Sequence, residues 1–397
     1  MTMTADVTEL VPDSLRKRLV ALRRQLHQEP ELAFNELKTA RSLEAALREL
    51  GIDEIRRVGD SGVVGRVCGR DRSAPVVAVR GDIDALPIQE ATGLSFASSI
   101  PNVMHACGHD VHAAWAVGAA ALLTSDPAAG DVLVVLQPAE EVGKGALAIL
   151  ESGALDGVAA IFGGHVDRRF DVGQVVADEG PLAASADMFE IELVGVGAHA
   201  ARPHEARDPI VALAAVVSAL QTIVARRLNP ATPGVVSIGM VQAGSAPNVI
   251  PDRARLSGTV RAVEPHSRAM MLSEVERVTK AVADGFGLEA KVVVDRGTPP
   301  IVNPPGPTKW ARQAAIDVVG ESNVVPLGFL NLAGEDFAHY MERVPGCFLR
   351  IGAREAGGPV IPAHSPVFYP AEESLFVGAA VLAECARVAS RELAVGR

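Results

Sequence analysis

Pro75-Val-Val-Ala-Val-Arg-Gly-Asp-Ile-Asp-Ala-Leu-Pro87 joins a short apolar run to a loop that carries two carboxylates. A continuous apolar run that ends in a charged loop is typical of a strand buried on both faces of a sheet. Similar runs occur at residues 131–136 and 158–162, while residues 12–51 and 113–123 have helical spacing of their apolar positions. Strands that alternate with helices predict an α/β fold with a mostly parallel central sheet flanked by helices.

The pattern changes near residue 186. Residues 187–194 alternate between apolar and polar side chains, as in a strand with one exposed face. A helix, two strands, a second helix and a last strand are predicted up to residue 294, an order typical of a small α+β domain. The sequence therefore predicts a catalytic domain formed by residues 1–185 and 298–397, interrupted by an inserted α+β domain at 186–297.

Composition excludes several classes of protein. The chain has 397 residues, 48% of them hydrophobic, and a net charge of -11, which disfavours a nucleic-acid partner because phosphate contacts require a basic surface. No signal peptide or bilayer-length apolar run is visible, so we expect no membrane association. The cysteines form no CxxC pair, which favours reduced thiols and a cytoplasmic location. We expect three of them to be small buried side chains, namely Cys68, Cys347 and Cys385.

Residues 104–112 read Met-His-Ala-Cys-Gly-His-Asp-Val-His and gather an unusual number of side chains that can bind metal. Thiolate and imidazole favour zinc, and nearby carboxylates extend the choice to manganese, cobalt or nickel. A polar turn in which histidines only satisfy backbone groups is the alternative interpretation. Further candidate groups follow the other predicted strands: Asp82 and Asp84, Glu140 and Glu141, His165, and His364 near the end of the chain.

Eight motifs occur in the order seen in one metallohydrolase family: RGDIDALP, MHACGHDVH, LQPAEEVGKGA, HAARPHEARDPI, NVIP, GTVR, AGEDFA and AHSPVF. The chain resembles the aminoacylase/carboxypeptidase family of two-metal peptidases over nearly its whole length. The similarity is to the branch of hippurate hydrolases, N-acyl-amino-acid amidohydrolases and auxin-conjugate hydrolases. MHACGHD and PAEE are specific to that branch, and the other motifs support it.

The resemblance implies two divalent metal ions per subunit and a role for each matching residue. Cys107 would join the two ions, and the other ligands would be His109, Glu141, His165 and His364. Glu140 would be the general base, and Asp84 would orient a ligand. The spacing of Glu140 and Glu141 does not itself distinguish the base from the ligand.

The resemblance also assigns a function to the inserted domain. It would act as a lid and as the contact surface of a homodimer, in which His199 stabilises the oxyanion at the partner's site. Asn248 and Arg261 would contact the substrate carboxylate or the oxyanion; for Arg261 a structural strand position is the alternative. Glu335 is expected to support the site rather than bind metal, and His27, His105 and His112 are expected to be structural.

The expected reaction is metal-assisted hydrolysis of the amide bond of an N-acyl amino acid. A dipeptidase or carboxypeptidase on the same centre is the alternative enzyme. A silent binding protein is disfavoured because base and ligands are all present, and a Cys107 nucleophile would leave the carboxylates idle.

The chain departs from the branch after His165, where Arg168 and Arg169 stand in a segment without the usual proline, and at Ala206 in place of glycine. We expect these changes to affect substrate choice through the approach to the site.

Overall fold

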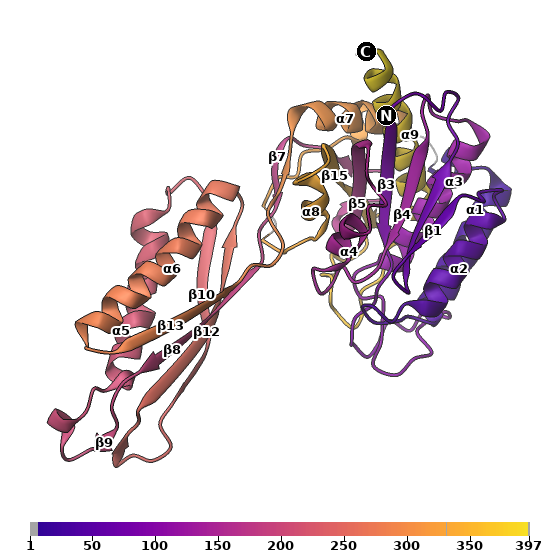
Figure 1. The fold of residues 1–397 in the computed structure, drawn as a ribbon. Helices are drawn as coiled ribbons and strands as arrows, with labels where there is room; N and C mark the ends of the chain where they lie inside the picture. Colours follow the sequence, from indigo (N-terminus) through magenta and orange to yellow (C-terminus); the bar gives the residue numbers. More distant parts are fainter. Residues whose placement is uncertain (1–6, 331, 396–397) are drawn as a thin grey trace. The chain divides into compact units, whose positions relative to one another are not determined.

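The computed structural model describes residues 7–330 and 332–395, and the chain divides into two compact units (Figure 1). Unit 1 contains Met1–Gly180, Asn303–Phe329 and Asp336–Arg397, whereas unit 2 contains Pro181–Val302 and Leu330–Glu335. Unit 1 is an α/β structure with a mostly parallel sheet, and unit 2 is an α+β structure inserted into it. The predicted fold class is thereby confirmed.

The sheet of unit 1 has seven strands in the order β1-β2-β4-β3-β5-β15-β6. Its four central strands are parallel to one another. Most of their residues are buried, as expected when helices cover a sheet, and β4 is apolar along almost its whole length. The strands are β1 (Ile55–Val58), β2 (Gly62–Val67), β3 (Val76–Asp82), β4 (Val132–Gln137), β5 (Val158–Asp171), β6 (Val175–Val176) and β15 (Gly346–Arg354).

Helices α1 (Asp13–Gln28), α3 (His109–Ser125), α7 (Pro305–Val319) and α9 (Ser374–Val395) pack in one group, α1 on α3, α3 on α9 and α9 on α7. Helix α2 (Leu37–Arg48) packs on β2, and the short helices α4 (Gly145–Glu151) and α8 (Phe337–Met341) pack on each other. Nearly every residue of α3 is buried, because α1, α9 and the sheet surround it.

Two local predictions for unit 1 were wrong. The helix expected over residues 12–51 is interrupted between α1 and α2, where Pro30 cannot supply the amide hydrogen that a continuing helix needs and Phe34 has a φ of 60°. Strand β5 does not end before Gly163, because β15 pairs with it in parallel as far as Asp171. His165 therefore lies within a strand rather than after one.

The sheet of unit 2 is antiparallel, in the order β10-β12-β8-β13. Its strands are β8 (Asp187–Val194), β10 (Gly234–Ala243), β12 (Arg253–Ala262) and β13 (Glu289–Asp295). Helices α5 (Pro209–Thr222) and α6 (Pro265–Gly285) pack on each other and on this sheet. Side chains of β8 alternate, with Phe189, Ile191 and Leu193 in the core of the unit.

Short two-stranded ladders complete the fold. Strand β7 (Gly180–Ala183) pairs with β14 (Ile301–Asn303), and β9 (Ala198–His199) pairs with β11 (Val249–Ile250).

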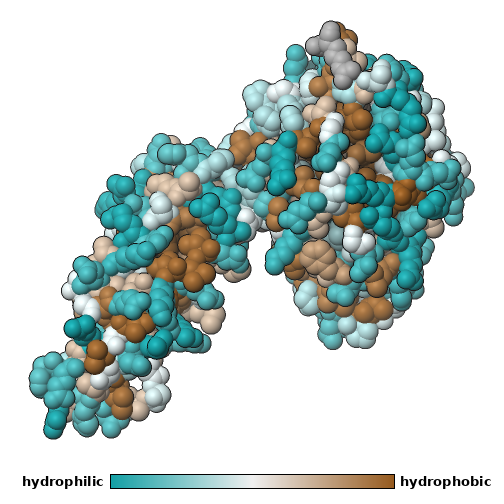
Figure 2. Space-filling model, viewed as in Figure 1, coloured by the Kyte–Doolittle hydropathy of each residue, from teal (hydrophilic) through white to brown (hydrophobic). Residues whose placement is uncertain are grey.

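Figure 2 shows hydrophilic side chains over most of the visible surface of both units, with apolar residues in patches. Residues Pro209–Arg227 are long and apolar enough to meet the length and composition of a membrane-crossing helix, but their buried side chains belong to the core of unit 2.

Candidate metal centre

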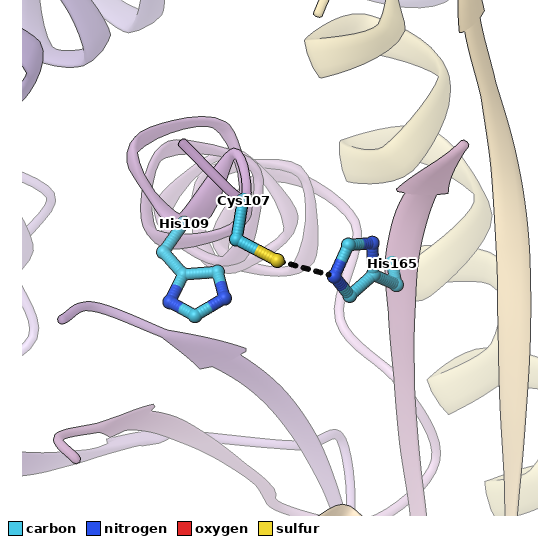
Figure 3. A group of neighbouring side chains, drawn as sticks. All are labelled: Cys107, His109 and His165. Atoms are coloured by element: carbon cyan, nitrogen blue, oxygen red, sulfur yellow. Dashed lines mark hydrogen bonds between the residues drawn. The ribbon is translucent and has the colours of Figure 1, made fainter. Parts of the chain in front are cut away.

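Gly108 shapes the turn that presents the first two donors. It precedes α3 with a φ of 88°, a conformation that favours glycine, and a Cβ there would lie 2.6 Å from Val166 Cγ2. Cys107 stands on one side of this turn and His109 opens the helix on the other. Cys107 Sγ lies 3.2 Å from Nε2 of His165 on β5, and Figure 3 shows the three side chains converging.

Two of the imidazole rings are oriented by carbonyl groups. His109 Nδ1 donates to the backbone oxygen of Asp84 at 2.9 Å and lies 3.1 Å from its carboxylate. His165 Nδ1 donates to the backbone oxygen of Val166 at 2.7 Å. In both rings Nε2 is therefore the nitrogen directed at the centre, an arrangement in which a partner behind the ring fixes the ligand.

The loop after β4 supplies the carboxylates. The amide of Glu141 donates to Asp84 Oδ2 at 3.0 Å, so Asp84 orients both this loop and His109. Glu141 Oε1 is 3.4 Å from His364 Nε2, and Glu140 Oε2 is 3.9 Å from His109 Nε2. Residues separated by up to 257 positions in sequence, from Cys107 to His364, thus contribute to one cluster.

Among the described residues the donor atoms form five groups, and two of these groups share the Cys107 thiol. Cys107, His109 and His165 place one donor atom each within 4.8 Å of one another, and so do Cys107, Glu141 and His364. His109 Nε2 and Glu141 Oε1 are buried and make no hydrogen bond to the described residues. Such atoms are costly to bury unless a partner compensates them. The residues present fit a pair of divalent cations, which these two donor groups would hold.

The electrostatics of the cluster agree with that fit. Burial raises the pKa of the Cys107 thiol, and the Glu141 carboxylate adds to the effect. Burial opposes a charge on His109, but Asp82, Asp84 and Cys107 together outweigh burial and hold the pKa of His109 well above its usual value. Burial also lowers the pKa of His165, which keeps that ring neutral. Divalent cations would replace the protons of Cys107 and His109, because both must be deprotonated to bind metal.

A buried polar network lies beside the centre and contacts its residues. His112 Nε2 accepts from the Val166 amide at 3.0 Å and Nδ1 donates to Asp82 at 2.6 Å, so both ring nitrogens are used within the protein. Arg80 contacts Asp82 and also lies 3.0 Å from Asp336, which accepts from Gln137 and the Ala146 amide. The sequence interpretation missed Arg80, Gln137 and Asp336. All three lie within the quoted motifs RGDIDALP, LQPAEEVGKGA and AGEDFA, but attention went to their neighbours Asp84, Glu140, Glu141 and Glu335.

Glu36 was also missed. Its buried carboxylate accepts from the amide of Ala139 at 2.8 Å, directly before Glu140, at a residue with a φ of 55°. Burial raises the pKa of this carboxyl. Glu36 therefore holds a backbone turn that a non-glycine residue adopts only at a cost.

Two expectations for individual residues require correction. Cys68 is exposed, because it follows the last paired residue of β2. Arg168 does not approach the centre: it is buried and binds the segment after β15. His27 is structural as expected, and its ring lies between Asp110 and Glu90 in the core.

The remaining predicted site residues belong to unit 2. His199 is exposed on β9, and its Nδ1 accepts from the Ala201 amide at 3.1 Å. Asn248 accepts from the Ala200 amide at 3.0 Å, which places it beside His199. Arg261 lies on β12, and a Cβ at Gly334 would be 3.7 Å from its guanidinium.

Comparison with known proteins agrees with this geometry. Residues 78–388 match the model of peptidase family M20/M25/M40. The chain is 39% identical to an N-acetyl-L-cysteine deacetylase of Bacillus subtilis over 89% of its own length and 84% of that protein, and 37% identical to an IAA-amino acid hydrolase of Arabidopsis thaliana over 93% and 84%. A Bacillus subtilis crystal structure described as a dinuclear metal-binding peptidase of the M20 family superposes with a TM-score of 0.85 at 37% identity, covering 96% of this chain and 99% of that one.

The cluster of metal-binding side chains on an α/β sheet, together with these similarities, identifies a metal-dependent hydrolase of amide bonds. The chain belongs to peptidase family M20/M25/M40.

Proposed function

We propose that this protein hydrolyses the amide bond of N-acyl amino acids, including hippurate-like substrates, to a carboxylic acid and a free amino acid. The observation that carries the proposal is the pair of donor groups that share Cys107 beside two adjacent glutamates. The similarity to the deacetylase and the IAA-amino acid hydrolase supports the substrate class.

The proposed metal ligands are Cys107, His109, Glu141, His165 and His364. Two bound divalent ions would polarise the amide carbonyl and lower the pKa of the attacking water. The thiol and imidazoles favour zinc, while the carboxylates leave manganese, cobalt or nickel as competitors in a metal-reconstitution experiment. Asp84 would hold two of the ligands in position, because it contacts both the His109 ring and the Glu141 amide.

Glu140 is the proposed general base. Its Oε1 accepts from the Asp336 amide at 3.3 Å, which fixes one side of the carboxylate, while Oε2 faces the donor atoms. Glu141 instead lies with Cys107 and His364 in a ligand group that Glu140 does not join. In the reaction Glu140 would take a proton from water and return it to the departing nitrogen.

Unit 2 is proposed to act as the lid and the dimer contact, with 186–297 as its core. His199 would donate to the developing oxyanion from a partner subunit, and Asn248 and Arg261 would bind the substrate carboxylate. We further propose a cytoplasmic homodimer without nucleic-acid or membrane partners. Light scattering tests the assembly, and mixing His199→Ala subunits with Glu140→Gln subunits should restore activity only if the histidine acts across the dimer.

Glu140→Gln is the decisive test of the mechanism. The variant should bind the same amount of metal as the native protein and lose about 10²–10⁴-fold in kcat, because a positioned base contributes that much. Native activity in this variant would eliminate Glu140 as the base. Chelation separates the mechanism from a Cys107 nucleophile: activity should vanish with the metal and return when metal is added.

A dipeptidase or carboxypeptidase activity is the second candidate, favoured by the match to a peptidase family. Comparing kcat/KM for acetyl, benzoyl and indolyl amides of one amino acid with that for dipeptides would separate the two functions. Higher values for dipeptides would favour the second candidate.

A further inference from the structure

Arg168 lies three residues after His165 on β5, yet its side chain points to the segment that carries His364. Arg168 is 2% exposed, and its guanidinium is surrounded by acceptors from residues 353–369. Nη1 donates to the carbonyl oxygen of Tyr369 at 2.8 Å, and Nη2 donates to the carbonyl oxygen of Pro359 at 3.0 Å. One side chain thus binds both ends of residues 359–369.

A carboxylate completes the arrangement around Arg168. Arg168 Nη2 donates to Glu355 Oε1 at 3.0 Å, and Arg168 Nη1 lies 2.8 Å from Glu355 Oε2. This is the forked ion pair that arginine forms with a carboxylate. Tyr369 donates its hydroxyl to Glu355 Oε1 at 2.7 Å, and its ring centroid is 4.4 Å from the guanidinium carbon. Hydrogen bonds from Arg168 lower the pKa of Glu355 to about 2, so the pair stays ionised at any pH at which the enzyme would be assayed.

His364 itself is weakly restrained by packing. Its side chain is 53% exposed, so packing does not restrain it as it restrains His109 or His165. Its φ is 66°, a conformation that a residue with a Cβ adopts only at a cost. Two backbone hydrogen bonds hold the middle of the segment, from the His364 amide to the carbonyl oxygen of Ala106 and from the Ala91 amide to that of Pro366, both at 2.8 Å. The contacts of Arg168 at the two ends add to this restraint.

We propose that Arg168 is a positioning residue for His364: by closing residues 359–369 at both ends, it preorganises that histidine toward Glu141 and Cys107. The inference rests on the proposed function in one respect, the assignment of His364 as a ligand. Arginine suits the task because its planar fork serves two carbonyls and a carboxylate at once, whereas a lysine ammonium is a point donor. Strand β5 would then fix one ligand directly, His165, and a second one through Arg168.

The test compares metal affinity in Arg168→Met, Arg168→Lys and the control Arg169→Met. Arg169 is the adjacent arginine on the same strand, but it pairs with Asp167 and lies over Phe329 rather than on the His364 segment. The probe is zinc on the full-length protein, titrated against a chelator of known affinity. Arg168→Met should weaken the more loosely bound zinc by roughly 10–100-fold, as loss of a supporting partner does. The zinc affinity of Arg168→Lys should lie between those of Arg168→Met and the native protein. The zinc affinity of Arg169→Met should equal that of the native protein.

A double-mutant cycle with His364→Ala separates the possible failures. If His364→Ala leaves zinc affinity unchanged, the ligand assignment in the proposed function fails. If His364→Ala weakens zinc binding and Arg168→Met does not, only the present inference fails. The proposal requires that the double variant binds zinc as weakly as His364→Ala alone, because a positioning residue has no effect once its target is absent. Additive losses would show that Arg168 acts elsewhere and would overturn the proposal.

Activity provides a second readout that a general loss of stability would not reproduce. At saturating zinc, kcat of Arg168→Met should recover toward the native value, whereas kcat of Glu140→Gln should not. Should Arg168→Met fail to fold by circular dichroism, Glu355→Gln carries the same test. That variant removes the ion pair but keeps the carbonyl contacts, and it should weaken zinc binding by a few-fold. Unchanged affinity in Glu355→Gln and Arg168→Lys together would refute the proposal.

Discussion

The ionic cluster behind the metal loop gives the sharpest prediction. His27 is completely buried between two carboxylates, with Nδ1 2.8 Å from Asp110 and Nε2 3.2 Å from Glu90. Arg23 lies 2.7 Å from the same Asp110 carboxylate. Burial opposes a charge on His27, but the two carboxylates outweigh burial and raise the pKa of His27 to about 9.

The magnitude follows from that pKa. A value of about 9 in the folded protein, against 6.5 in the unfolded chain, corresponds to roughly 3 kcal/mol in favour of the charged ring. Because the folded pKa is the higher one, this stabilisation is complete below pH 6.5 and is lost as the pH rises through 9. The free energy of unfolding of unit 1 should therefore contain a term that disappears over this alkaline range.

The assay is denaturant unfolding of the native protein and His27→Gln between pH 6 and pH 10. Tryptophan fluorescence reports on unit 1, since Trp115 and Trp310 are the only tryptophans of the chain and both belong to it. The difference in unfolding free energy between the two proteins should be largest at pH 6 and should shrink by roughly 3 kcal/mol by pH 10.

The control is His266→Gln, which changes an exposed histidine at the start of α6 in unit 2. Its difference from the native protein should stay near zero across the same range. A destabilisation by His27→Gln that does not vary with pH would refute the reasoning, because it would mean that the ring is neutral and acts only by packing.

Other substitutions test the remaining parts of the site. Cys107→Ala should reduce bound metal below two ions per subunit, measured by atomic emission after gel filtration, and unchanged stoichiometry would contradict a shared thiol ligand. Asp84→Asn should lower activity by roughly 10–100-fold, because the His109 ring and the Glu141 loop lose a common acceptor; native activity would argue against that role. Asp336→Ala removes a buried partner of Arg80 and should destabilise unit 1 by about 3 kcal/mol in urea, and a loss below about 1 kcal/mol would contradict the network.

The sequence predicted three of the seven strands in the sheet of unit 1, namely β3, β4 and the first part of β5, for a physical reason. A strand covered on both faces is apolar along its whole length, so β3 and β4 are visible without knowledge of their neighbours. The end of β5 was not predictable in this way. Its second half contains charged residues and is a strand only because β15, more than 180 residues later, pairs with it.

The residues of the proposed metal centre also differ in how far the sequence alone reveals them. Cys107 and His109 are recognisable from one short segment, because so many metal-binding side chains in nine residues serve no packing purpose. The supporting roles of Arg80, Glu36 and Asp336 are not recognisable in this way, because the three residues come from separate segments of the chain. Their roles depend on distances that only the folded chain sets.

The sequence by itself predicted the α/β order and the kinds of side chain that could bind metal, because these depend on local periodicity and on chemical type. Tertiary structure alone brought Cys107, Glu141 and His364 together and decided what Arg168 binds. Charged side chains such as Arg168, Asp110 and His27 look like surface residues in a sequence. Folding placed them in the core, where each is stable only because an opposite charge from a distant segment compensates its burial.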